Sequence, residues 1–267
     1  MPGSSNGSRG CGANMPEPIL ETRHLAKRFG AIVATDDVTM TVLPGELHAV
    51  IGPNGAGKTT LLAQLAGEVA PTGGRVFLDG RDITGLSSWQ RSRRGIARSF
   101  QVTSLCQEFT ALENVAIAVQ AHQGHSFRIW RRARRDPSLL RPAQAFLDMV
   151  GLGARAGIRA GLLAHGEQRQ LEVAVALACR PRVLLFDEPM AGMGRDESHR
   201  MMRLIRELKG RHAILLIEHD MDVVFAVADR ITVLVYGRIV ASGTPAEIAA
   251  NADVRAAYLG ERGAARA

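Results

Sequence analysis

The nine residues GPNGAGKTT, Gly52 to Thr60, follow the apolar run 46–51 and open a helical stretch that reaches Ala66. They satisfy the pattern G-x-x-x-x-G-K-[ST] between a strand and a helix, which is the context that this pattern requires. The glycines let backbone N–H groups close on phosphates, Lys58 reaches the β- and γ-oxygens, and the Thr59 hydroxyl binds Mg²⁺. The sequence therefore predicts a site for a nucleoside triphosphate.

Two carboxylates end a later apolar run, RVLLFDEP, residues 182–189. Ligands bind at the carboxyl ends of parallel strands, so we expect Asp187 beside the Mg²⁺ ion. Glu188 is then placed to orient or deprotonate the attacking water. The next apolar run ends in IEHD, 217–220, which brings His219 to the same edge of the sheet within reach of the γ-phosphate.

Continuous apolar runs at 183–186, 213–217 and 231–235 alternate with helical stretches near 196–208 and 221–228. This pattern predicts a parallel sheet covered by helices on both faces. The alternating segments 19–25 and 38–42 predict an antiparallel β piece near the N-terminus, and helical periodicity runs from about 104 to 178. The expected fold is α/β: a P-loop NTPase core plus an N-terminal antiparallel β piece and an inserted helical subdomain. We expect a disordered leader at 1–16, one ATPase domain at 17–260 with the helical subdomain inserted at about 104–178, and a tail at 261–267.

Composition narrows the class of protein. The chain has 267 residues, 46% of them hydrophobic, and no stretch approaches the roughly 18 unbroken apolar residues of a membrane span. The first residues have no apolar core of a signal peptide, so we expect a cytoplasmic protein. The three cysteines form no C-x-x-C pair, which indicates neither a metal site nor a disulfide framework. The net charge of +7 owes much to arginines between 91 and 141, without interleaved aromatic residues. We expect the arginine-rich surface to be solvated or to contact a protein partner. Lipid headgroups are the second expectation for this surface, and nucleic acid is the third.

A second anion site is predicted at LLAHGEQRQ, residues 162–170. The stretch reads as the start of a helix, and a helix N-terminus with free N–H groups near Gly166 attracts anions. Two further residues have open roles. Phe29 is either a core aromatic or a stacking face for a base. Gln101 stands where the β core passes into the helical part, and its carbonyl could touch Mg²⁺ when that part docks.

Together these motifs resemble the ATP-binding subunit of ABC transporters, from about Ile19 to Gly260. The motifs, in the family's order, are the adenine-stacking aromatic Phe29, Walker A 52–60, the Q-loop residue Gln101, the signature LAHGEQ 163–168, Walker B with its glutamate 183–188, the D-loop AGMG 191–194 and the switch histidine His219. Within the family, the stretches LAHGEQRQLEVA, MAGMG, LLIEHDMD and ADVRAAYLG look most like the branched-chain amino acid uptake type.

The resemblance implies ATP hydrolysis by two subunits that face head to tail, so that the signature helix of each caps the γ-phosphate held by the other. The residues it assigns to ATP are Phe29, Gly52, Pro53, Asn54, Gly55, Ala56, Gly57, Lys58, Thr59 and Thr60, with Ala164, Gly166 and Gln168 for the partner's nucleotide. Those it assigns to catalysis are Glu188, His219, Lys58 and Gln101, and those it assigns to Mg²⁺ are Thr59, Gln101 and Asp187.

The resemblance also implies partners and a place in the cell. These are a second ATPase subunit (the same chain or a related one), transmembrane permease subunits, and indirectly a solute-binding protein, at the cytoplasmic face of the inner membrane. The implied function is import of branched-chain amino acids or a similar small polar solute. A lipid or polysaccharide exporter, and a soluble ABC ATPase acting on nucleic acid or ribosomes, remain alternatives, although nucleic acid is disfavoured as a partner.

Two positions depart from the family's pattern. Ala164 replaces the usual signature serine, which removes a hydroxyl from the γ-phosphate. Gly194 replaces the usual acidic or amide residue of the D-loop, so we expect the coupling between the two sites to be altered.

Overall fold

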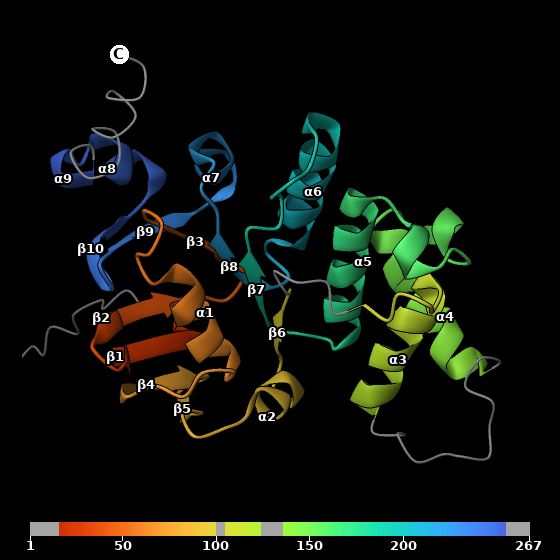
Figure 1. The fold of residues 1–267 in the computed structure, drawn as a ribbon, viewed down its shortest axis with the longest axis horizontal. Coiled ribbons are helices and arrows are strands. Elements are labelled where there is room, and N and C mark those ends of the chain that lie inside the picture. The colour runs from red at the N-terminus through yellow and green to blue at the C-terminus, as the bar shows by residue number, and fades with distance from the viewer. Residues whose placement is uncertain (1–15, 100–104, 124–135, 255–267) are drawn as a thin grey trace, which may run out of the picture.

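The computed structural model describes residues 16–99, 105–123 and 136–254, and every structural statement below concerns these residues. The chain forms two sheets and a group of helices beside them (Figure 1). Most of the leader and the whole tail expected from the sequence lie outside the described residues, as does the arginine-rich segment 124–135. In the described part of the chain, no helix is both long and apolar enough to cross a membrane.

The larger sheet has six strands in the order β10-β9-β3-β8-β7-β6. These strands are β3 (Leu47–Ile51), β6 (Ile96–Arg98), β7 (Val183–Asp187), β8 (Ala213–Ile217), β9 (Arg230–Val235) and β10 (Arg238–Gly243). All neighbours are parallel except β10, which pairs antiparallel with β9. Every residue of β3, β7 and β8 is buried, as continuous apolar strands in a parallel sheet should be.

The two faces of this sheet pack into different parts of the core. Alternate side chains of a strand point to opposite faces. Accordingly, Leu185 of β7 packs in the cluster that contains α1 (Lys58–Ala66), whereas Leu184 and Phe186 pack in the cluster that contains α5 (His165–Ala178). Both faces are therefore covered, and the predicted fold class is confirmed. The remaining helices of this core are α2 (Ser88–Arg93), α6 (Arg195–Leu208), α7 (Met221–Val227), α8 (Pro245–Ala250) and α9 (Ala252–Val254).

The smaller sheet is antiparallel, with the strand order β2-β1-β4-β5. Its strands are β1 (Leu20–Phe29), β2 (Ile32–Val42), β4 (Gly73–Leu78) and β5 (Arg81–Asp82). β1 and β2 form a hairpin around Phe29 and Ile32, longer than the two alternating segments that the sequence predicts. This sheet packs against α1, and Phe29 is the last residue of β1, where it pairs with Ile32 at the end of the hairpin.

The helical part lies between β6 and β7 in the chain and at the side of the sheet in Figure 1. It consists of α3 (Ala111–Gln123), α4 (Pro137–Met149) and α5, with short 3-10 turns at Gly153–Arg155 and Ala160–Leu162. Asp136 caps α4 by accepting a hydrogen bond from the Ser138 N–H, and Pro137 occupies the first turn, where its missing N–H costs nothing. Buried residues of α3, α4 and α5 belong to the same hydrophobic cluster as those of β7, β8 and α6, so this subdomain packs continuously with the core of the larger sheet.

Candidate functional site

The glycine-rich loop joins β3 to α1 with little space around its backbone. Gly57 has φ +98°, and a Cβ there would lie 1.9 Å from the Ala34 carbonyl oxygen. A Cβ at Gly52 would lie 2.1 Å from the Leu234 carbonyl oxygen. These positions admit glycine alone, because any side chain would displace the backbone of β2 or β9. The loop therefore keeps its N–H groups at the N-terminus of α1, where an anion is stabilised.

Lys58 is the first residue of α1 and is buried at 7% exposure. Its ammonium donates hydrogen bonds to the carbonyl oxygens of Gly52 and Pro53 at 2.6 and 3.0 Å, which links the first residue of α1 to the start of the loop. Burial lowers the pKa of Lys58, and the nearby Glu188 and Asp187 carboxylates oppose this effect. The lysine of α1 thus lies in one electrostatic cluster with Asp187, the last residue of β7, and with Glu188, which follows it.

Asp187 ends β7 and its side chain is 1% exposed. One oxygen, Oδ2, accepts a hydrogen bond of 2.8 Å from the Arg98 guanidinium. The other, Oδ1, is buried and has no hydrogen-bond partner among the described residues. Burial raises the pKa of Asp187, although Arg98 works against this. An ionised carboxylate with one unpartnered oxygen fits a divalent cation.

The donor set near Asp187 favours Mg²⁺ bound together with phosphates. Within the described ranges, no group of three or more His, Cys, Asp or Glu side chains could hold a metal by itself. Mg²⁺ is commonly held by one or two protein oxygens, by waters and by the phosphates of the substrate. Thr59, exposed in the first turn of α1, is the second protein oxygen assigned to the ion by the sequence.

Glu188 follows Asp187 in a left-handed backbone conformation, φ +47°. Its N–H donates to the Ile217 carbonyl at 2.9 Å, which ties it to the end of β8. His219 Nδ1 lies 3.9 Å from Glu188 Oε2, so the predicted base and the switch histidine meet at one edge of the sheet. The carboxylate of Glu188 is 26% exposed, which leaves it open to water.

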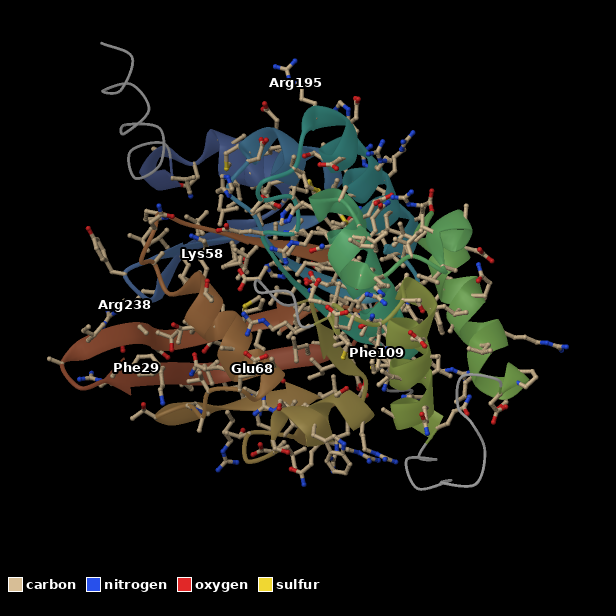
Figure 2. The ribbon with its side chains drawn as sticks, turned by 45° about the vertical axis from the view of Figure 1, so that its right-hand side comes forward. Phe29, Lys58, Glu68, Phe109, Arg195 and Arg238 are labelled. Atoms are coloured by element: carbon tan, nitrogen blue, oxygen red, sulfur yellow. The ribbon has the colours of Figure 1, made fainter. Side chains whose placement is uncertain are left out.

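Two residues that the sequence did not single out hold this cluster in place. Arg98 of β6 links Asp187 to Glu68, the residue that Figure 2 labels beyond the C-terminal end of α1. Glu218, 1% exposed, accepts hydrogen bonds from the Met190 and His219 N–H groups at 3.3 and 3.2 Å. Glu218 directly precedes His219 in the sequence, so its position next to a predicted site residue could have identified it. No local sequence pattern points to Arg98, because it reaches Asp187 only through the parallel pairing of β6 with β7, two strands that are far apart in the chain.

Phe29 lies at the end of β1 and is 48% exposed. The Lys27 ammonium is 4.9 Å from the centroid of its ring. Of the two roles considered for Phe29, a core aromatic is excluded by this exposure. A ring that faces solvent is available for stacking on a base.

The predicted signature stretch begins α5, with Ala164 as its N-terminal flanking residue. The Glu167 carboxylate accepts a hydrogen bond from the Ala164 N–H at 3.0 Å. Gly166 packs closely on α6, since a Cβ there would lie 2.7 Å from the Glu197 carboxylate. Gln168 donates to the carbonyls of Ala160 and Leu163, both at 3.1 Å, and so fastens the turn before the helix.

The structure does not bring this stretch to the P-loop of the same chain. Lys58, Asp187, Glu188 and His219 form one cluster. The N-terminal end of α5 lies beyond α6 and β7 from α1 in Figure 1. Gln101, whose carbonyl is predicted to touch Mg²⁺ when the helical part docks, lies outside the described residues.

Comparison with known proteins agrees with this geometry. Residues 35–191 match the ABC transporter family, and residues 238–264 match the family described as branched-chain amino acid ATP-binding cassette transporter. The chain is 41% identical to the high-affinity branched-chain amino acid transport ATP-binding protein BraF of Pseudomonas aeruginosa, over 92% of this chain and 100% of that one. It is 40% identical to LivG of Escherichia coli K12, which carries the same description, with the same coverage.

Solved structures give the same result for the fold. The ADP conformation of an ATP-binding cassette of an ABC transporter superposes with a TM-score of 0.81 at 29% identity, over 91% of this chain and 99% of that one. A nucleotide-free cassette superposes with a TM-score of 0.80 at 28% identity, with the same coverage.

Proposed function

The chain belongs to the ATP-binding subunits of ABC transporters, in the branched-chain amino acid group, and on that premise we propose that it powers the import of branched-chain amino acids or a similar small polar solute. As a member of this family it binds and hydrolyses ATP. The solute is proposed from the C-terminal match at 238–264 and from the descriptions of its relatives.

The observation that carries the catalytic part is the cluster at the end of β7. Glu188 is the general base: its partly exposed carboxylate takes the proton of the attacking water. His219, whose Nδ1 lies 3.9 Å from Glu188 Oε2, contacts the γ-phosphate. Lys58 exchanges its two carbonyl partners for phosphate oxygens when ATP binds. Phe29 stacks on the adenine. Asp187 and Thr59, with Gln101, hold Mg²⁺, which when bound neutralises phosphate charge.

A complete site needs a second subunit. The N-terminal end of α5, with Ala164, Gly166 and Gln168, lies apart from the P-loop of its own chain and would serve the nucleotide of a head-to-tail partner. A helix N-terminus carries roughly half a positive charge, which acts on the γ-phosphate once the two subunits close. The partner is either a second copy or a related chain.

The subunit is proposed to work at the cytoplasmic face of the inner membrane, bound to permease subunits and served indirectly by a solute-binding protein. The helical part is the proposed docking region, because Gln101 stands at its root in the sequence.

The test of the catalytic proposal is Glu188→Gln. The amide keeps the shape of the side chain but cannot take a proton, so hydrolysis should fall by about 10²–10⁴-fold, the usual contribution of a general base. ATP binding should persist, and the variant should accumulate as an ATP-bound dimer on size exclusion. Hydrolysis near the wild-type rate would rule out this role for Glu188.

A further inference from the structure

Arg98 reaches the proposed metal ligand from the neighbouring strand. It is the last residue of β6 and lies opposite Leu185 of β7 in the parallel pairing. Side chains two residues apart on a strand point to the same face, so Asp187 shares with Leu185 the face that packs on α1. Arg98 Nη2 donates a hydrogen bond of 2.8 Å to Asp187 Oδ2. The pairing of the two strands therefore sets this contact.

The Arg98 guanidinium is held at both ends. Its Nη1 pairs with Glu68, which lies just past the C-terminal end of α1, the helix that Lys58 begins (Figure 2). Its third nitrogen, Nε, is buried and has no hydrogen-bond partner in the part of the chain that the structure describes. The guanidinium is planar, so its N–H donors have fixed directions. Because Glu68 takes Nη1, Asp187 receives its hydrogen bond from Nη2 rather than a bidentate pair.

The two carboxylate oxygens of Asp187 consequently differ. Oδ2 accepts the hydrogen bond from Arg98, whereas Oδ1 is buried and without a partner among residues 16–99, 105–123 and 136–254. The Arg98 side chain is 8% exposed, so water screens its charge weakly. A guanidinium at this distance repels a metal ion placed at the same oxygen. A metal ion can therefore bind Oδ1 but cannot share both oxygens.

This restriction distinguishes between divalent cations. Ca²⁺ accepts a larger and more variable set of oxygen ligands, and a carboxylate often binds it through both oxygens. Mg²⁺ requires a nearly octahedral set, and in nucleotide sites it takes one or two carboxylates together with waters and phosphates. A carboxylate with one available oxygen suits Mg²⁺ better than Ca²⁺.

We propose that Arg98 is a positioning residue that sets the metal selectivity of the site. By holding Oδ2, it restricts Asp187 to one metal–oxygen bond and so favours Mg²⁺ over Ca²⁺. Arg98 acts through Asp187 and does not itself touch the metal. The inference rests on the proposed function, because it needs Asp187 as a ligand of the nucleotide-bound metal.

The test measures binding of N-methylanthraniloyl-ADP, a fluorescent nucleotide, to the full chain with saturating Mg²⁺, with saturating Ca²⁺, or with EDTA. ADP is not hydrolysed, so the readout is independent of activity. The measured quantity is the Kd with Ca²⁺ divided by the Kd with Mg²⁺. Arg98→Met removes the donors and keeps an aliphatic side chain, which frees Oδ2. The ratio should fall about 10-fold, the weight of one hydrogen bond to a charged group.

Two further variants separate selectivity from stability. Arg98→Lys keeps a cationic donor for Oδ2 and should retain more of the ratio than Arg98→Met. Arg182→Met is the matched control, since Arg182 pairs with Asp79 at the surface, and its ratio should equal that of the wild type. If Arg98 has only a structural role, Arg98→Met weakens both complexes by the same factor. An unchanged ratio in Arg98→Met would therefore overturn the inference.

The wild-type chain supplies a second test that depends on no variant. Mn²⁺ bound with ADP is followed by electron paramagnetic resonance and displaced by Mg²⁺ or by Ca²⁺. The chain should prefer Mg²⁺ over Ca²⁺ more strongly than ADP does in free solution, and an equal preference contradicts the inference. If the fluorescent ADP binds equally well in EDTA, the assignment of Asp187 to the metal fails instead, so the two failures are distinguishable.

Discussion

Arg98→Gln tests the structural basis of the site through stability. The Arg98 side chain is 8% exposed and pairs with the 1% exposed Asp187 and the 31% exposed Glu68. Removing one partner of a buried ion pair leaves the other charge uncompensated. Lys58 also acts on Asp187, and the glutamine amide can keep one hydrogen bond, so we expect a loss of about 2–3 kcal/mol, below the usual upper range. For a chain of this size that is a Tm lower by about 5–10 °C.

The matched control is Arg182→Gln, one residue before β7. Arg182 pairs with Asp79, but the two side chains are 55% and 38% exposed, so the loss should stay below about 1 kcal/mol. Thermal melts of both variants without nucleotide supply the comparison. Equal Tm changes for the two variants would refute the reasoning, because they would show that burial of the Arg98–Asp187 pair has no energetic weight.

The pH dependence has a defined sign. Burial raises the pKa of Asp187 and Arg98 opposes this, so in Arg98→Gln the pKa rises further. A carboxyl whose pKa is raised on folding favours the folded state at pH values below its unfolded pKa, and this advantage is lost as the pH rises through the folded pKa. The Tm gap between Arg98→Gln and the wild type should therefore be larger at pH 8 than at pH 5.

Two further predictions concern other parts of the chain. His48 is 1% exposed and its pKa is lowered to about 4 by burial, from 6.5, so as the pH falls from 6.5 to 4 the folded state should lose about 3 kcal/mol that a His48→Gln variant does not lose. Urea unfolding at several pH values checks this, and a variant with the wild-type pH slope would contradict it. Ala164→Ser supplies the hydroxyl missing at the start of α5 and should tighten ATP-driven dimerisation by about 0.5–1.5 kcal/mol, the net worth of one hydrogen bond. Because serine is also a good N-cap residue, the Tm of the monomer should rise as well. The dimer dissociation constant in the presence of ATP is therefore the measurement that reports on contact with the partner's nucleotide.

The sequence predicted the parts of the site that depend on local pattern. The loop 52–60 and the acids of β7 lie where the motifs indicate, because a glycine-rich turn and the end of an apolar strand are encoded by adjacent residues. The continuous apolar runs also predicted the parallel sheet, since strands buried on both faces have no polar alternation.

What the sequence could not predict depends on contacts between distant segments. Arg98 and Asp187 are 89 residues apart, and their contact exists because β6 pairs with β7 at the edge of the sheet. The close approach of Gly166 to Glu197 is of the same kind. A Gly166→Asp change would place its carboxylate against Glu197 and disturb α6, so Ala164→Ser is the better probe of the signature.

The most direct test of the account is ATP hydrolysis by this subunit reconstituted with its permease and binding protein in lipid nanodiscs. Leucine, isoleucine or valine should stimulate hydrolysis severalfold over the isolated subunit, and Glu188→Gln should remove that activity. If nucleic acid stimulates the isolated subunit at moderate salt, where non-specific phosphate contacts are weak, and branched-chain amino acids have no effect on the complex, the importer function is contradicted.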